Sequence, residues 1–207
     1  MKKVFNLIIV YESGSMSCIE KQALSGINET LLTIQQTQHQ HEELKQNVTL
    51  LFFDDNHRNY KYFNSPAGET KVLTPKDYSP CGCTPLYDAI GEAVSKVNAL
   101  VEKDDEVLVT IITDGYENAS HEFTLQMVKN LIEKLKEQGW TFTLIGTDNL
   151  DVEGMAQSLS IEDHLAFKED ANGTAAMFAE ERESRACFYE AVAKGTARKR
   201  GSFFRKA

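Results

Sequence analysis

The sequence contains few cysteines and no long uncharged apolar run. Four cysteines in 207 residues are too few for a disulfide scaffold, so we expect reduced thiols. No segment approaches the roughly 18 uncharged apolar residues that a membrane span requires. The apolar share of 42% and the charged share of 26% are typical of a globular domain with a substantial core. These features exclude a disulfide-rich module and a membrane-spanning protein.

Several motifs of nucleotide-binding proteins and enzymes are also missing. The chain has no Gly-x-x-x-x-Gly-Lys loop and no Gly-x-Gly-x-x-Gly turn, so nucleotide binding has no support. The Gly-x-Ser-x-Gly elbow of many hydrolases is absent as well. The start from Met1 to Lys3 resembles that of a signal peptide, but Asn6 interrupts the apolar run and no small-residue cleavage site precedes Glu12. We therefore expect a cytoplasmic protein.

Charge is unevenly distributed along the chain. The net charge of −9 argues against general nucleic-acid binding by the body of the protein. Residues 194–207, in contrast, hold six Lys or Arg and no acid. We therefore divide the chain into one domain, 1–193, and a basic C-terminal tail, 194–207. Such a tail is a candidate contact for nucleic acid, an anionic membrane surface or an acidic protein patch, or it folds back onto the acidic body.

Apolar periodicity predicts alternating strands and helices. Strands are expected at 4–10, 48–53, 59–63, 107–113, 140–146 and 164–167. Helices are expected at 19–38, 85–101, 125–135, 152–159 and 172–193, with a polar connection over 35–46 and an irregular stretch over 66–80. This alternation indicates an α/β fold: one doubly wound, mostly parallel sheet with one antiparallel edge strand (59–63) and helices on both faces.

Polar side chains follow three of the predicted strand ends. Ser13 and Ser15 come after the first strand, Thr84 stands just before a helix, and Asp114 ends the strand 107–113. Ligands usually bind at the carboxyl ends of strands in such sheets. Hydroxyl and carboxylate oxygens are hard ligands that suit Mg²⁺, and neutral hydroxyls leave the ion open to an acidic group on a partner. The pattern therefore predicts an oxygen-lined site at this edge.

These residues resemble the motif of the von Willebrand factor type A (vWA) domain family. Its metal-ion-dependent adhesion site (MIDAS) combines Asp-x-Ser-x-Ser with a distant threonine and a distant aspartate. Ser13 and Ser15 match the two serines, Thr84 matches the threonine and Asp114 the second aspartate. The resemblance covers 4–193 and is greatest to small, stand-alone bacterial cytosolic members. It implies a non-enzymatic protein-binding module that engages a partner's Asp or Glu side chain through Mg²⁺ or Mn²⁺.

One position departs from the family motif. Tyr11 stands where the motif begins with aspartate, which removes one of two carboxylates near the ion. Glu12 is adjacent and acidic, but successive side chains of a strand point to opposite faces. The resemblance therefore implies a degenerate site in which Tyr11 is exposed or plugs the cradle, and Mg²⁺ or Mn²⁺ binds weakly or not at all.

Three other interpretations remain open. Ser13 and Ser15 would cap the following helix while Asp114 accepts backbone N–H bonds, with no metal. A Ser/His hydrolase would use Ser13 or Ser15 with His121 as its base. A nucleic-acid accessory protein would bind through the basic tail.

The pair Cys81 and Cys83 lies directly before Thr84. No second Cys or His pair completes a zinc site, so these thiols are predicted to pack in a tight loop.

Overall fold

The structure is a computed structural model, and it describes residues 2–12, 19–55, 57–78, 83–197 and 201–204. The described strands are β1 (Lys2–Tyr11), β2 (Leu44–Phe53), β3 (Arg58–Pro66), β4 (Glu106–Thr113), β5 (Thr141–Thr147) and β6 (Asp163–Phe167). The described helices are α1 (Glu20–Gln40), η2 (Ala67–Glu69, one 3₁₀ turn), α2 (Leu86–Asn98), α3 (Leu125–Glu137), α4 (Val152–Ser158) and α5 (Ala171–Ala193).

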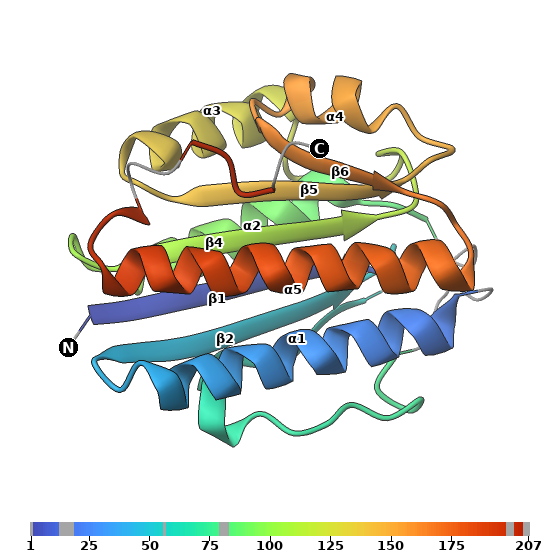
Figure 1. The fold of residues 1–207 in the computed structure, drawn as a ribbon. Coiled ribbons are helices and arrows are strands. Elements are labelled where there is room, and N and C mark those ends of the chain that lie inside the picture. The colour runs from blue at the N-terminus through green and yellow to red at the C-terminus, as the bar shows by residue number, and fades with distance from the viewer. Residues whose placement is uncertain (1, 13–18, 56, 79–82, 198–200, 205–207) are drawn as a thin grey trace.

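The strands form one sheet in the order β3-β2-β1-β4-β5-β6. All neighbouring strands are parallel except β2 and β3, which are antiparallel, so β3 is the antiparallel edge strand that the sequence predicts. The carboxyl ends of the parallel strands lie together at one edge of the sheet (Figure 1). The predicted fold class, a doubly wound mostly parallel sheet, is confirmed.

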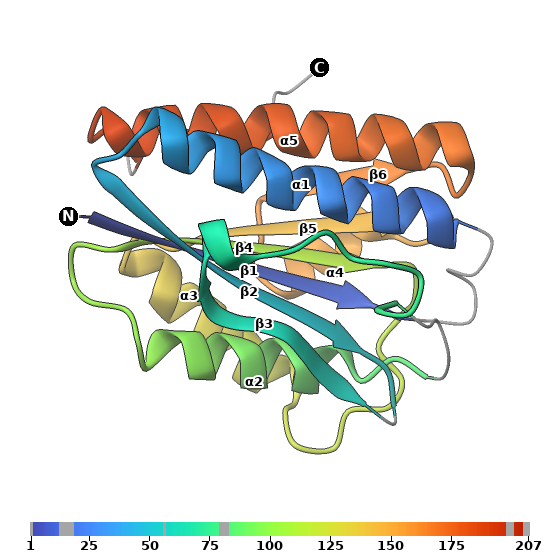
Figure 2. The same cartoon turned by 90° about the horizontal axis from the view of Figure 1, so that it is seen from below.

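Two helical layers enclose the sheet. Helices α1 and α5 cover one face, and α2, α3 and α4 cover the other (Figure 2). Strand β1 is buried on both sides because its apolar run places Ile8 and Val10 against α1 and α5, and Leu7 and Ile9 against the opposite layer. The central position of β1 therefore follows directly from its near-continuous apolar sequence.

Several predicted boundaries differ from the structure. The edge strand predicted at 59–63 extends over Arg58–Pro66, and the stretch 66–80, predicted to be irregular, contains the 3₁₀ turn Ala67–Glu69. The polar segment 35–46 is not a simple connection, because α1 continues to Gln40 and β2 begins at Leu44. The Gln38 side chain accepts the Gln46 N–H at 2.6 Å and also bonds Leu44 O, so polar residues close this turn.

The helix predicted to run over 85–101 is also shorter than expected. It begins after Pro85, which occupies the N-cap, and ends at Asn98. Val101 therefore lies outside α2, although it packs against the edge of the core.

A buried polar network attaches α5 to the sheet. The Arg185 guanidinium is 0% exposed and bonds Glu181 Oε1 at 2.6 Å, Thr110 Oγ1 at 2.8 Å and Asn6 Oδ1 at 3.1 Å. Burial alone disfavours the Arg185 charge, but Glu181 and Tyr189 outweigh burial and raise its pKa. These bonds join α5 to β1 and β4 in the centre of the apolar layer.

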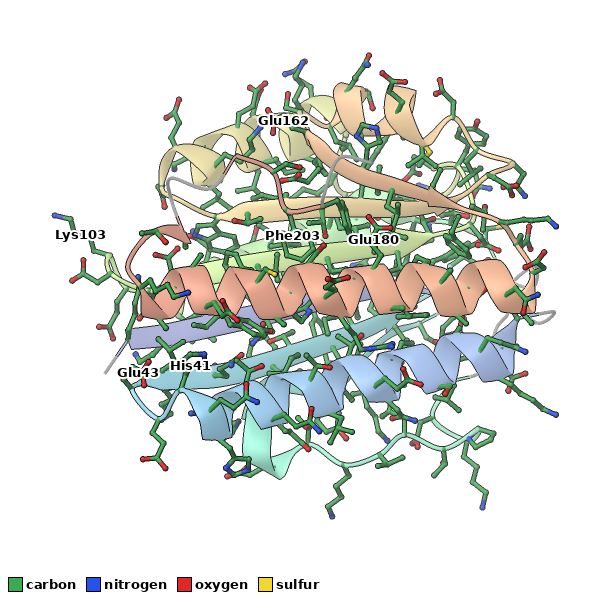
Figure 3. All side chains as sticks on the ribbon, viewed as in Figure 1. His41, Glu43, Lys103, Glu162, Glu180 and Phe203 are labelled. Atoms are coloured by element: carbon green, nitrogen blue, oxygen red, sulfur yellow. The ribbon has the colours of Figure 1, made fainter. Side chains whose placement is uncertain are left out.

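The described part of the tail folds back onto the body through its aromatic residues. Phe203 is 2% exposed and packs on Phe188, with ring centroids 6.3 Å apart, and Phe204 is buried beside it. Asp163 Oδ1 accepts the Phe203 N–H at 2.7 Å and the Ser202 hydroxyl at 2.6 Å. Figure 3 shows Phe203 between α5 and the β5–β6 side of the sheet.

None of the helices in the described residues has the length and apolarity that a bilayer crossing requires.

Candidate functional site

The structure brings three of the predicted site positions together at the carboxyl edge of the sheet. Tyr11 ends β1, Asp114 follows β4, and Thr84 precedes α2. Ser13 and Ser15 lie outside the described residues, so their part in the site stays a prediction. We call these five positions the cradle.

Tyr11 plugs the described part of the cradle, because it is only 3% exposed. Its ring centroid lies 5.2 Å from that of Phe53, and its hydroxyl hydrogen-bonds the Thr84 side chain. Burial raises the pKa of Tyr11 above its ordinary 10.0, Asp114 adds to this effect, and the bond to Thr84 opposes it. A Cβ on Gly115 would lie 2.8 Å from Thr84 Oγ1 and 3.2 Å from Tyr11 Cε1, so this contact leaves no spare room.

Glu12 follows Tyr11 directly after β1 and is buried, with 6% of its surface exposed. Tyr11 belongs to the layer under α2 and α3, whereas Tyr78, whose pKa Glu12 raises together with burial, belongs to the α1 and α5 layer. The Tyr78 hydroxyl donates to Tyr11 O at 3.3 Å, and the Glu12 N–H donates to Phe53 O at 2.9 Å. The expected alternation of side chains, by which Glu12 would not replace the missing aspartate, stays a prediction.

Thr84 is held by the loop that follows β4. Asn118 Oδ1 accepts the Thr84 N–H at 2.8 Å, and the Asn118 N–H donates to Thr84 O at 3.1 Å. These two bonds pair the segment before α2 with residues 114–124, and the Thr84 side chain lies against Gly115, the residue after Asp114.

The same loop caps α2 from outside the helix. Pro85 at the N-cap provides no side-chain cap, so the first N–H groups of α2 need other acceptors. Glu117 Oε2 accepts the Tyr87 N–H at 2.9 Å, and Ser120 Oγ accepts the Asp88 N–H at 3.0 Å. Glu117 also accepts the Ser120 N–H at 2.7 Å, which closes the loop on itself. Residues 117–120 thus supply the cap that the sequence around 85 lacks.

Asp88 organises the next part of the loop from the first turn of α2. Its carboxylate accepts three successive backbone N–H groups, from His121 and Glu122 at 2.9 Å and from Phe123 at 2.7 Å. Arg58 Nη2 adds a fourth bond at 3.1 Å, and the Asp88 side chain is only 2% exposed. The conformation of residues 121–123 therefore depends on one buried carboxylate.

Arg58 joins β3 to this arrangement. Its guanidinium bonds Glu92 at 2.7 Å and Glu122 at 3.3 Å in addition to Asp88. The Glu92 carboxylate also accepts the Tyr60 hydroxyl at 3.1 Å. Three carboxylates thus surround one cation beside the cradle.

A cleft of about 380 Å³ opens beside this ion cluster. It lies between the loop after β2, the start of α2 and the loop after β4. Its lining residues are Asp54, Asp55, His57, Arg58, Pro85, Asp88, Ala119, His121 and Glu122. Four of the nine lining residues are acids, and the lining also holds one arginine and two histidines.

His121, the base of the hydrolase interpretation, is exposed on the wall of this cleft. Its backbone N–H is bound to Asp88, and its proposed nucleophiles, Ser13 and Ser15, lie outside the described residues. Among the described residues, no three His, Cys, Asp or Glu side chains are grouped to hold a metal ion.

The thiols add little to the site as described. Cys83 is an exposed free thiol directly before Thr84, and Cys187 is a half-buried cysteine on α5. Cys81 lies outside the described residues, so the predicted packing of the Cys81 and Cys83 pair stays untested.

Sequence reasoning missed Arg58, Asp88, Glu117 and Asn118. One signal was available for Asp88, because an acid is favoured in the first turn of a helix. Glu117 and Asn118 reach across to another element, and their pairing is not visible in any local pattern.

Several solved structures share the fold of this chain. The vWF domain of the type V pilus tip protein Mfa5 from Porphyromonas gingivalis is 11% identical, with a TM-score of 0.61 over 90% of this chain and 96% of that one. The SpRpn10 VWA domain is 12% identical, with a TM-score of 0.62 over 87% and 95%. The PilB minor pilin from Streptococcus sanguinis is 10% identical, with a TM-score of 0.62 over 90% and 61%.

At these identities the likeness shows the fold alone. The chain is an α/β domain whose mostly parallel six-stranded sheet, with helices on both faces, matches the fold of these vWA domains. It spans less than two thirds of longer similar proteins, from 30% to 62% of their length. No family model and no curated protein matches the sequence.

Proposed function

We propose that this chain is a non-enzymatic protein-binding module of the vWA type that engages a partner at its carboxyl edge. The binding surface consists of residues 54, 55 and 57, 83–85 and 114–124, which we call the rim. Similar folds occur in proteins named as a pilus adhesin and a pilus tip protein, which supports an interaction module. The expected cytoplasmic location and bacterial origin stay predictions.

The observation that carries the proposal is the attachment of the loop after β4. Glu117, Asn118 and Ser120 bond the start of α2, and Asp88 holds the three amides of 121–123. A surface that is already ordered loses less conformational entropy when a partner binds. Tyr116 stands on this loop with 51% of its surface exposed, and its hydroxyl accepts the Asp151 N–H at 2.8 Å. Fixed, exposed aromatics of this kind are favoured as interface anchors.

Photocrosslinking tests where a partner binds. A photoreactive phenylalanine derivative replaces Tyr116, or replaces Lys103 at the opposite edge as a matched exposed control (Figure 3). We expect a discrete protein adduct in extract of the source cells from position 116 and none from position 103. The captured protein, once purified, should bind the unmodified chain and should lose affinity for the Asp88→Asn variant.

Other results would favour the alternatives. An adduct that forms equally from positions 103 and 116, or no adduct from 116, contradicts the proposal. Ester turnover that the Ser13→Ala and His121→Ala variants both abolish would favour the hydrolase. Salt-sensitive nucleic-acid binding that is lost on deletion of 195–207 would favour the accessory protein. Because this deletion also removes the buried Phe203 and Phe204, a variant with the Lys and Arg residues of the tail replaced by Gln should lose the same binding.

A further inference from the structure

The described cradle residues, Tyr11, Thr84 and Asp114, do not fit the metal that the vWA resemblance implies. A tightly held divalent cation needs several oxygen ligands with carboxylate charge around it. Here the phenol of Tyr11 replaces a carboxylate, hydrogen-bonds Thr84 and is closed in by Phe53 and Gly115. The Thr84 hydroxyl, which the resemblance assigns to the ion, is therefore used by a neutral group of the protein itself.

Without a cation, the carboxyl edge keeps the negative charge of its own residues. Each parallel strand other than β1 is followed by exposed or half-buried acids, including Asp55 after β2, Glu117 and Glu122 after β4, Asp148 after β5 and Asp170 after β6. Within residues 54–57, 114–124, 148–151 and 168–170, the sequence holds a single lysine or arginine, Lys168. The Lys168 ammonium is bonded to Asp170 at 2.8 Å.

The cleft concentrates this charge beside the cradle. Its lining holds four acids, Asp54, Asp55, Asp88 and Glu122. The basic residues of the lining are Arg58 and two histidines, His57 and His121. The Arg58 guanidinium is already matched by the carboxylates of Asp88, Glu92 and Glu122. An acidic partner would meet like charge here, whereas a cationic side chain would find carboxylate acceptors in a concave, partly desolvated site.

We propose that the partner presents a basic segment, with lysine or arginine side chains entering the cleft between residues 54–57 and 119–122 without a bridging metal. This inference rests on the proposed function and specifies the partner of that same surface. The preference is the reverse of the acidic partner that the family resemblance implies. The physical reason is that Tyr11 replaces a carboxylate that would help to hold the cation. The partner is then recognised by the surrounding carboxylates and not by a metal ion.

Two synthetic peptides of equal length test the sign of the recognised charge. One carries the sequence Arg-Gly-Lys-Gly-Arg-Gly-Lys, and the other Asp-Gly-Glu-Gly-Asp-Gly-Glu, each with the same fluorophore for anisotropy measurements. We expect the unmodified protein to bind the basic peptide and not the acidic one, with the same affinity in EDTA and in millimolar Mg²⁺. Amide resonances of the rim, including those of residues 119–122, should shift on titration with the basic peptide.

Matched charge variants separate the cleft from the overall negative charge. The double variant Asp55→Asn with Glu122→Gln removes two cleft charges, and Glu102→Gln with Asp104→Asn removes two exposed charges at the opposite edge. The first should weaken basic-peptide binding roughly fivefold, which corresponds to about 1 kcal/mol for the two charges together, and the second should change it by less than about twofold. Equal weakening by both variants would overturn the inference.

The Tyr11→Asp variant provides the reverse test. Restoring the carboxylate should allow Mg²⁺ to bind, detectable by calorimetry, and should produce Mg²⁺-dependent binding of the acidic peptide, while Tyr11→Phe should not. Mg²⁺-dependent binding of the acidic peptide by the unmodified protein would overturn the basic-partner inference and leave edge binding intact. Failure to bind either peptide would also overturn the basic-partner inference. The proposed function is tested separately, by crosslinking from position 116.

Discussion

Two arginines, Arg185 and Arg58, organise ion clusters in different parts of the molecule. Arg185 is 0% exposed and lies between α5 and the sheet, where Glu181 neutralises its charge. The Arg58 side chain is 25% exposed and lies at the carboxyl edge among Asp88, Glu92 and Glu122. The same pairing of guanidinium and carboxylate therefore occurs once in the core and once beside a cleft.

The difference lies in what each cluster holds in place. The Arg185 cluster connects regular elements, because its partners stand on α5, β1 and β4. The Arg58 cluster reaches irregular backbone through Asp88, which holds residues 121–123. Removing a charge from the first cluster should affect the whole fold, whereas the same change in the second should act mainly on the rim.

The largest expected effect is that of Arg185→Met. The substitution leaves the Glu181 carboxylate buried without its cation, and we expect a loss of about 3–5 kcal/mol in the free energy of unfolding, measured with urea. Arg182→Met, three residues earlier on α5, is the matched control, because Arg182 pairs with the half-exposed Glu29. The control should lose less than about 1 kcal/mol. Similar losses of unfolding free energy in both variants would show that the buried ion pair contributes no more than the exposed one.

The next effect is that of Asp88→Asn. The amide offers one carbonyl oxygen in place of two carboxylate oxygens that accept four bonds, so we expect a loss of about 1–3 kcal/mol. Hydrogen exchange should accelerate at the amides of 121–123 and remain unchanged on α5. Asp104→Asn, at an exposed position, serves as the control. An unchanged exchange rate at 121–123 would contradict the role given to Asp88.

Acid should affect the rim through Asp88. Burial opposes ionisation of Asp88, but the three amides and Arg58 outweigh burial, so its pKa is lowered from the ordinary 3.8. A lowered pKa stabilises the folded state above pH 3.8, and this contribution is lost as pH falls through the lower folded value. The Asp88-dependent part of the Phe123 amide chemical shift, taken as the difference from the Asp88→Asn variant, should therefore change only below pH 3.8. The Asp88→Asn variant should lack this transition.

The smallest effect should be that of Glu122→Gln. Glu122 is 63% exposed and lies 3.3 Å from Arg58, so its ion pair should contribute less than about 0.5 kcal/mol. Glu92→Gln provides a comparison within the same cluster, because Glu92 is 20% exposed and also bonds Tyr60 and Lys96. We expect the Glu92 variant to lose more free energy of unfolding, by about 1 kcal/mol. Equal losses would mean that exposure does not rank these pairs.

The elements that could be predicted are those with a regular apolar repeat. Strands β1 and β4 and the stripe of α2 follow from residues whose burial is set by periods of 2 or 3.6, or by an unbroken apolar run. The meeting of Tyr11, Thr84 and Asp114 followed from the topology, because parallel strands end at the same edge.

The contacts that could not be predicted join residues far apart in sequence through single hydrogen bonds. Asp88 accepts one bond from the Phe123 N–H and another from the Arg58 guanidinium. Both bonds span loops whose shapes no local pattern encodes. The docking of Phe203 was hidden for a different reason. Its basic neighbours dominate the composition of the tail, although two aromatics provide its attachment.

The bonds that Asp88 accepts from residues 121–123 come from the main chain and not from side chains. The path of the backbone at positions 121 and 122 therefore does not depend on which side chains these positions carry. Related sequences are free to exchange these two side chains, and so to acquire a new binding preference, while the supporting architecture is inherited unchanged.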